Sequence, residues 1–381
     1  MVEVPVYRPF LHGNEEKYVL ECLRSTWISS KGSFIAQFER SFQEYVGTPF
    51  ASSVNNGTVA LHLALVALGI QPGDQVLVPS LTYVACINAI CYVGAEPVLV
   101  DSLPNTWQMD PVDAANKITA KTRAILAVHL YGHPCDIVQL KVLADQYGIF
   151  LIEDCAEALG AQVGSTHVGN FGHVATYSFF GNKTITTGEG GMVVVQDPSL
   201  HERIQILKNQ GNAPNRAYWH SMIGFNYRMT NIAAAIGLAQ IEQVALILEK
   251  KRNLAERYRK LLQNLPLSVH EELSGYHHSY WMVSVILDRS EDRDLLRQHL
   301  LSCGIETRPF FFPLQHLPMY CHLQKCPVAE DISARGLNLP SFPDLTDKEL
   351  VFICDQIRYY YRTHSSCLDA ADTPAVLPTF I

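Results

Sequence analysis

The chain has 381 residues, a formal net charge of -8 at pH 7 and an apolar content of 48%. This length exceeds what one small core needs and predicts about two or three domains of an ordinary folded globular protein. Because the charge is acidic and no cluster of Lys and Arg offsets it, the composition argues against nucleic acid or an anionic membrane as the main partner.

The cysteines and the N-terminus indicate the compartment. Ten cysteines are scattered along the chain without a C-x-x-C pair, which fits reduced thiols and does not suggest a metal site such as zinc. The first residues, MVEVPVYRPF, lack the basic flank and apolar core of a signal peptide. We therefore expect a cytoplasmic protein.

The first part of the chain alternates between helix and strand patterns. In chain order it gives a helix after a turn (55–69), a strand (75–80), a helix (83–94), a strand (96–101), a strand (123–132), a helix (136–148) and two further strands (149–158 and 173–180). The apolar window 76–100 has the length of a membrane span, but prolines and polar residues divide it, so it is interpreted as strand, helix, strand. This alternation predicts an α/β domain with a mostly parallel sheet, assigned to residues 1–245.

The second part of the chain has a different pattern. Residues 234–265 predict a long helix that bridges two lobes. Strand and helix signals follow at residues 280–287, 292–305, 306–312 and 347–362, and they predict a smaller α+β domain over residues 246–364. Residues 365–381 contain prolines and no periodicity, so we expect a flexible tail there.

The turn NNGT, residues 55–58, is a candidate phosphate site. It opens a helix, and the free N–H groups and the dipole of a helix N-terminus attract anions. A turn that only caps its helix uses the same residue types, and on the turn alone this second interpretation is the stronger one.

Three acids lie in the strand pattern of residues 149–158. Glu153 and Asp154 end the strand, where carboxylates either bind a cation or face a positively charged group. For Glu153 a helix cap or a structural ion pair is the favoured interpretation, and Glu157 is ambiguous in the same way.

Lys183 follows the strand that carries Ser178. A desolvated lysine at such a place acts as an amine nucleophile and forms a Schiff base with a carbonyl compound. A helix N-terminus for phosphate, a carboxylate such as Asp154 for a protonated ring nitrogen, and a lysine for an aldehyde are together what pyridoxal phosphate requires. Lys183, once released by the incoming amine, is the base and acid that moves the proton.

Two rival phosphate motifs fail on their context. Residues 181–184, GNKT, resemble the end of a P-loop, but Asn182 stands where glycine has to precede the lysine. Residues 188–192, GEGGM, lead into a strand pattern and not into a helix, so they are not a dinucleotide-binding turn.

Seven segments in register resemble the DegT/DnrJ/EryC1/StrS family of sugar aminotransferases, from about Leu11 to Pro340. They are TWISSKGSFI, NNGTVALHLAL, PSLTYVA, VHLYGHPCD, IEDCAEALGA, YSFFGNKTITTGEGGM and GFNYRMTNIAAAIGLAQ. The resemblance implies pyridoxal 5'-phosphate as the cofactor and its fold type I, in which a large domain with a mostly parallel seven-stranded sheet lies between helices, beside a smaller C-terminal α+β domain.

The resemblance also implies roles for residues near the cofactor. Lys183 would hold the cofactor covalently, Asp154 would pair with the pyridine nitrogen, and Tyr83 would stack on the ring. Glu157 falls where the family often has Gln or His near the cofactor hydroxyl. Taken alone, Tyr83 is more typical of a core aromatic.

The same resemblance implies a phosphate site and a second subunit. Gly57, Thr58 and Ser178 would hold the phosphate, and Asn226 would reach it from the second subunit of a homodimer. Without the resemblance, Asn226 is an ordinary turn residue.

Two arginines are candidates for the nucleotide diphosphate. Arg228 and Arg308 either bind it or pair with surface acids. Gln315 stands where relatives commonly have histidine in a PLH sequence, and this departure leaves substrate contacts in the smaller domain undefined.

The activity implied is the transfer of the amino group of glutamate to C4 of GDP-4-keto-6-deoxy-mannose, with a dTDP- or UDP-linked 4-keto-6-deoxy sugar as the alternative. A sugar dehydratase of this family is expected to carry histidine in place of the lysine, whereas this chain keeps Lys183. A non-catalytic regulator predicts a decayed site, whereas the cofactor positions named above are all chemically competent.

Overall fold

A large sheet forms the centre of the first part of the chain. The computed structural model describes residues 3–365, and within them seven strands pair in the order β1-β9-β8-β5-β4-β2-β3. Their bounds are β1 Phe50–Val54, β2 Gln75–Pro79, β3 Glu96–Val100, β4 Thr122–Val128, β5 Phe150–Asp154, β8 Val174–Ser178 and β9 Gly191–Val195. Strands β3, β2, β4, β5 and β8 pair in parallel, and β9 is antiparallel to both β8 and β1. The prediction of a mostly parallel sheet is confirmed.

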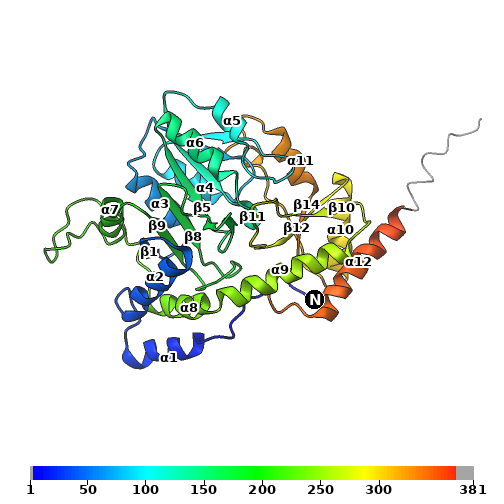
Figure 1. Ribbon diagram of the computed structural model, residues 1–381, viewed down its shortest axis with the longest axis horizontal. Helices are drawn as coiled ribbons and strands as arrows, with labels where there is room; N and C mark the ends of the chain where they lie inside the picture. Colours follow the sequence, from blue (N-terminus) through cyan, green and yellow to red (C-terminus); the bar gives the residue numbers. More distant parts are fainter. Residues whose placement is uncertain (1–2, 366–381) are drawn as a thin grey trace, which may run out of the picture.

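Helices cover both faces of this sheet (Figure 1). On β4, Leu126 faces a core shared with α3 and α4, whereas its neighbour Ile125 faces a second core shared with α6. A strand buried on both faces has to be apolar along its whole length, which is why these strands read as continuous apolar runs. The bounds are α3 Gly57–Ala67, α4 Ala85–Tyr92, α5 Pro111–Asn116, α6 Ile137–Tyr147 and α7 Pro198–Lys208.

The helix predicted over residues 234–265 is two helices. α8 spans Asn231–Glu242 and α9 spans Val244–Leu261, with a bend of 60° between them. The bend follows from the packing partners, because α8 lies on α1 and α2 while α9 continues toward β10, β12 and α12. The bounds of the first two helices are α1 Glu15–Ser25 and α2 Ser33–Val46.

Membrane-spanning helices were sought among residues 3–365. No single helix there is long and apolar enough to cross a membrane, and only the bent pair α8 and α9 passes on length and composition.

A second, antiparallel sheet follows α9, in the strand order β10-β12-β14-β13. The bounds are β10 Leu267–Val269, β12 Val283–Leu287, β13 Arg308–Pro309, β14 Gly336–Leu339, α10 Ser290–Ser302, α11 Pro327–Arg335 and α12 Asp347–Ser365. This α+β part agrees with the predicted pattern, although the strand expected over 306–312 is only two residues long. The domain boundary at residue 245 stays a prediction, and the tail beyond residue 365 lies outside the described residues.

A small third sheet links the two parts. Strand β11, Tyr276–His277, pairs with β6, Gln162–Val163, which pairs with β7, Thr166–His167. At the N-terminus, Val4 forms a bridge with Ile305. The pairing of β11 with β6, which follows β5 in the chain, ties the second part of the chain to the carboxyl end of β5, where parallel sheets bind their ligands.

Candidate active site

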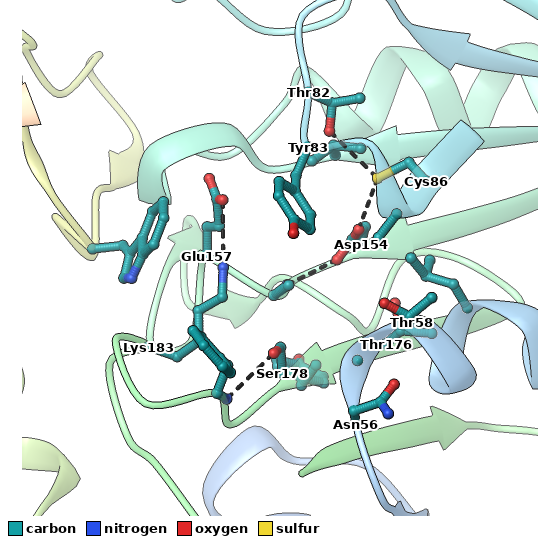
Figure 2. Close-up of a pocket in the computed structure, with 18 of the residues that line it drawn as sticks. Asn56, Thr58, Thr82, Tyr83, Cys86, Asp154, Glu157, Thr176, Ser178 and Lys183 are labelled. Atoms are coloured by element: carbon teal, nitrogen blue, oxygen red, sulfur yellow. Dashed lines mark hydrogen bonds and ion pairs between the residues drawn. The ribbon is translucent and has the colours of Figure 1, made fainter. Parts of the chain in front are cut away.

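A cavity of about 640 Å³ lies at the carboxyl ends of β4, β5 and β8. The N-terminus of α3 and the loop after β8 form one side, and residues from β12, β13 and β14 or next to them form the other. Figure 2 shows the side chains that point into this space. Cavities at this edge of an α/β sheet are the usual place for a ligand.

Lys183 lies in the loop after β8 and points into the cavity (Figure 2). Its Nζ is 3.4 Å from Oε1 of Glu157 and 4.0 Å from the ring centroid of Trp281. The backbone carbonyl of Lys183 accepts a hydrogen bond of 2.7 Å from the hydroxyl of Tyr7. The amine is therefore held in place through both its main chain and its side chain.

Asp154 is the last residue of β5 and is buried against the cavity. Its Oδ1 accepts the N–H of Ala156 at 2.9 Å, and its Oδ2 accepts a hydrogen bond from Sγ of Cys86 at 3.1 Å. Burial raises the pKa of Asp154, and these two donors together with the Lys183 charge oppose the rise. The carboxylate thus has a fixed direction, and among residues 3–365 it has no ion-pair partner.

Glu157 follows β5 and is buried beside Lys183. Its Oε2 accepts the backbone N–H of Tyr131 at 2.9 Å. Burial raises the pKa of Glu157, and the ammonium of Lys183 and the Tyr131 N–H oppose the rise. The geometry therefore places this carboxylate next to the lysine.

Glu153 is bound by backbone N–H groups and a histidine of its own chain. Its carboxylate accepts backbone N–H groups of Gly169, Phe171 and Gly172 and pairs with Nε2 of His129 at 3.1 Å. Glu153 and His129, together with Cys155, have the composition of a metal site. Because protein donors already surround the Glu153 oxygens, the structural ion pair is the interpretation that the geometry supports.

The N-terminus of α3 is capped by its own turn and also borders the cavity, while its role as a phosphate site stays a prediction. Oδ1 of Asn56 caps the helix by accepting the N–H of Val59 at 3.0 Å. Gly57, Thr58 and Ser178 line the cavity. A Cβ atom added to Gly57 would lie 2.8 Å from Cβ of Ser178, so this close approach requires glycine.

Of the remaining predicted residues, two line the cavity and two do not. Tyr83 lines the cavity with 55% of its surface exposed, and Arg308 lines it from β13, 3.5 Å from Glu306. Asn226 and Arg228 hydrogen-bond to each other and are not among the residues that line this cavity. Within one chain, the described residues do not bring these two to the site.

Sequence reasoning missed several side chains that line the site, among them Trp281 and Cys86. Trp281 precedes β12, and its Nε1 donates to the carbonyl of Asn182 at 2.7 Å. Cys86 lies on α4. Both stand in apolar runs that are typical of core elements, so periodicity gave no signal that would have separated them from the core.

The cavity fits pyridoxal phosphate. It combines an amine at Lys183, a buried carboxylate at Asp154 and a helix N-terminus, the groups that this cofactor's aldehyde, ring nitrogen and phosphate require. The hydroxyl of Thr176, which lines the same space, is buried and lacks a hydrogen-bond partner among the described residues. Fold and site together define a pyridoxal phosphate enzyme.

The chain belongs to the DegT/DnrJ/EryC1/StrS aminotransferase family, whose model matches residues 9–358. It is 54% identical to the GDP-perosamine synthase of Escherichia coli O157:H7, over 95% of this chain and 99% of that protein. It is 49% identical to the GDP-perosamine synthase of Vibrio cholerae, over 94% of this chain and 99% of that protein.

Solved structures agree with this membership. The aminotransferase TlmJ from Streptoalloteichus hindustanus superposes with a TM-score of 0.91 at 30% identity, covering 96% of this chain and 100% of that one. The sugar aminotransferase Spr1654 from Streptococcus pneumoniae, in its PLP form, gives 0.89 at 27% identity, covering 94% and 98%. The protein is a pyridoxal phosphate-dependent aminotransferase with the fold of these enzymes.

Proposed function

We propose that this aminotransferase moves the amino group of glutamate to C4 of GDP-4-keto-6-deoxy-mannose and so forms GDP-perosamine. The observation that carries the proposal is the 54% identity to a GDP-perosamine synthase over 99% of that protein. A dTDP- or UDP-linked 4-keto-6-deoxy sugar is the alternative acceptor. The presence of Lys183 favours amino transfer over dehydration.

Residues that line the cavity would hold the cofactor's phosphate, ring nitrogen and ring face. Gly57 and Thr58 at the start of α3, with Ser178 on β8, provide backbone and hydroxyl donors for its phosphate. Asp154 provides the buried carboxylate for the ring nitrogen, since a protonated nitrogen relieves the cost of burying that charge. Tyr83 provides an aromatic face beside the ring site, and Glu157 lies at the ring hydroxyl position implied by the family resemblance.

Lys183 carries the proton chemistry. Pyridoxal phosphate supplies an aldehyde that takes up the amino group and a ring that delocalises the electron pair left by a departing proton. Nζ of Lys183 would hold that aldehyde and, once free and uncharged, would take the proton from the carbon that bears the nitrogen and return it to the carbon on the other side of that nitrogen. Glu157 keeps this amine inside the cavity at 3.4 Å.

The proposed assembly is a homodimer. Asn226 lies outside the cavity of its own chain, so we assign it, as an expectation, to the cavity of a second copy. Arg228, which hydrogen-bonds to Asn226, and Arg308 are proposed to meet the nucleotide diphosphate. The cytoplasmic location also stays a prediction.

A substrate panel tests the proposal. The purified enzyme is incubated with glutamate and, separately, GDP-, dTDP- and UDP-4-keto-6-deoxy sugars, and amino-sugar products are detected by mass. We expect product from the GDP sugar, and turnover of only dTDP or UDP sugars would refute the GDP assignment. In parallel, borohydride should fix the cofactor to the peptide that contains Lys183, and Lys183→Ala should lose both the label and the turnover.

A further inference from the structure

Lys183 Nζ lies between a carboxylate and an indole. Oε1 of Glu157 is 3.4 Å away, and the ring centroid of Trp281 is 4.0 Å away. Figure 2 shows the contact between Lys183 and Glu157. The side chain of Lys183 is only 13% exposed and that of Glu157 only 4%, so little water screens these interactions.

Both partners of the ammonium are fixed by other contacts. The indole N–H of Trp281 donates to the carbonyl of Asn182 at 2.7 Å, and its ring is parallel to that of Tyr131. Glu157 is fixed by the N–H of the same Tyr131, whose φ of 55° lies in the left-handed region that few side chains adopt. One residue thus orients both the carboxylate and the indole toward Lys183.

An ammonium and the face of an indole attract each other, most strongly where water is excluded. A buried carboxylate adds a second attraction, and it is costly to bury without a positive partner. A lysine nitrogen bonded to a cofactor carbon is no longer an ammonium with three N–H donors, so it has neither attraction to the same degree. The two contacts therefore favour states in which Lys183 is free and charged.

We propose that Glu157 and Trp281 form a seat for the free ammonium of Lys183, and that the seat sets the balance between the pyridoxal and pyridoxamine forms of the enzyme. The inference rests on the proposed function, because the amine has to be free in one half of the transamination and bonded in the other. In the seat, both residues act through Lys183, and this effect is separate from the proposed place of Glu157 at the ring hydroxyl. The seat stabilises the pyridoxamine form, in which Lys183 is free.

Binding of the two cofactor forms to the apoprotein tests the seat without any turnover. Pyridoxal 5'-phosphate takes the lysine nitrogen out of the seat, whereas pyridoxamine 5'-phosphate leaves it there. Removing the seat should therefore raise the ratio of Kd for pyridoxamine phosphate to Kd for pyridoxal phosphate. For Trp281→Leu we expect a rise of about tenfold, the order of magnitude of a desolvated cation–π contact.

Two further single variants and one variant background separate the seat from a general loss of packing. Trp281→Phe keeps an aromatic face and should give a smaller rise than Trp281→Leu. Glu157→Gln keeps size and removes charge, and it should also raise the ratio. In a Lys183→Ala background, which has no ammonium, replacing Trp281 or Glu157 should leave the ratio unchanged.

Two results would contradict the proposed seat. One is a Kd ratio equal to that of the wild type in both Trp281→Leu and Glu157→Gln. The other is a rise of the Kd ratio in the Lys183→Ala background that equals the rise seen with Lys183 present. Because neither glutamate nor a nucleotide sugar is present, these results are independent of the substrate panel. If the Kd ratios change as expected but the GDP sugar gives no product in the substrate panel, only the proposed acceptor is refuted.

Discussion

The thiol of Cys86 lies 3.1 Å from Oδ2 of Asp154, and both side chains are buried at the edge of the cavity. The hydroxyl oxygen of Thr82 is 3.3 Å from the same sulfur. Because an ionised carboxylate only accepts hydrogen bonds, the S–H must donate to Asp154 and the Thr82 hydroxyl is then free to donate to the sulfur. This chain of donors favours the ionised form of a carboxylate whose pKa is raised by burial.

Replacing Cys86 should therefore alter how tightly the cofactor is held. Cys86→Ala removes one of the donors to Asp154, so the carboxylate is less readily ionised and pairs less well with a ring nitrogen. We expect Kd for pyridoxal phosphate to rise by about three- to tenfold, the order of magnitude of one weak hydrogen bond to a charged group. Cys86→Ser keeps a donor and should stay near the wild-type value, as measured by titrating the apoprotein. Equal losses in the two variants would contradict this role.

Gly57 gives a steric prediction. An added Cβ would lie 2.8 Å from Cβ of Ser178, which belongs to a central strand that cannot move aside. Gly57→Ala should thus displace the start of α3, lower the free energy of unfolding by about 1–3 kcal/mol and weaken cofactor binding further. Gly181→Ala is the matched control, because an added Cβ there has no atom within 4 Å among the described residues. Thermal unfolding and cofactor titration of both variants check this, and equal behaviour would contradict it.

Much of the fold was predictable because its signals are local. The strands β2 to β5 each contain a continuous apolar run, and α6 ends at a glycine, Gly148. The bend near Gln243 was not predictable, because no glycine or proline marks it and it depends on which helices α8 and α9 contact.

The candidate site also contains residues that the sequence predicted and residues that only the tertiary structure reveals. Lys183, Asp154 and Gly57 stand at the junctions of strand and loop or loop and helix, where a sequence pattern reveals exposed chemistry. Trp281 comes from a distant segment whose apolar run equally describes a core strand, and only the tertiary structure brings its ring to 4.0 Å from Lys183. The predicted role of Asn226 depends on a second copy of the chain. The structure of a single chain therefore does not test this role.

Two buried histidines predict a pH dependence of stability. Burial lowers the pKa of His270 and of His278 well below the usual value, and His133 opposes their protonation as well. In the unfolded chain each would take up a proton near pH 6.5, whereas in the folded chain both stay neutral. The unfolded state then binds more protons, so stability is fully present above about pH 6.5 and is lost as the pH falls below it.

The loss should approach about 1.4 kcal/mol per pH unit for each of these histidines. Nδ1 of His278 accepts the N–H of Tyr280 at 2.9 Å, and the side-chain oxygen of asparagine has the reach to replace it. His278→Asn should therefore reduce the slope of unfolding free energy against pH by one proton between pH 6.5 and 5. Urea titrations of the apoprotein at several pH values measure this slope, and an unchanged slope in the variant would contradict the assignment.

The predicted role of Asn226 across a subunit boundary has a direct test. If Asn226 serves the cavity of a partner, a dimer of one Asn226→Ala chain and one Lys183→Ala chain has one cavity with both defects and one with neither. Each variant alone should be strongly impaired, and co-expression should restore amino-sugar formation through the intact cavity. If Asn226 instead serves its own chain, each cavity of the mixed dimer keeps one defect and co-expression restores nothing. Arg228→Ala in place of Asn226→Ala asks the same question of the neighbouring side chain, which hydrogen-bonds to Asn226 at 2.8 Å.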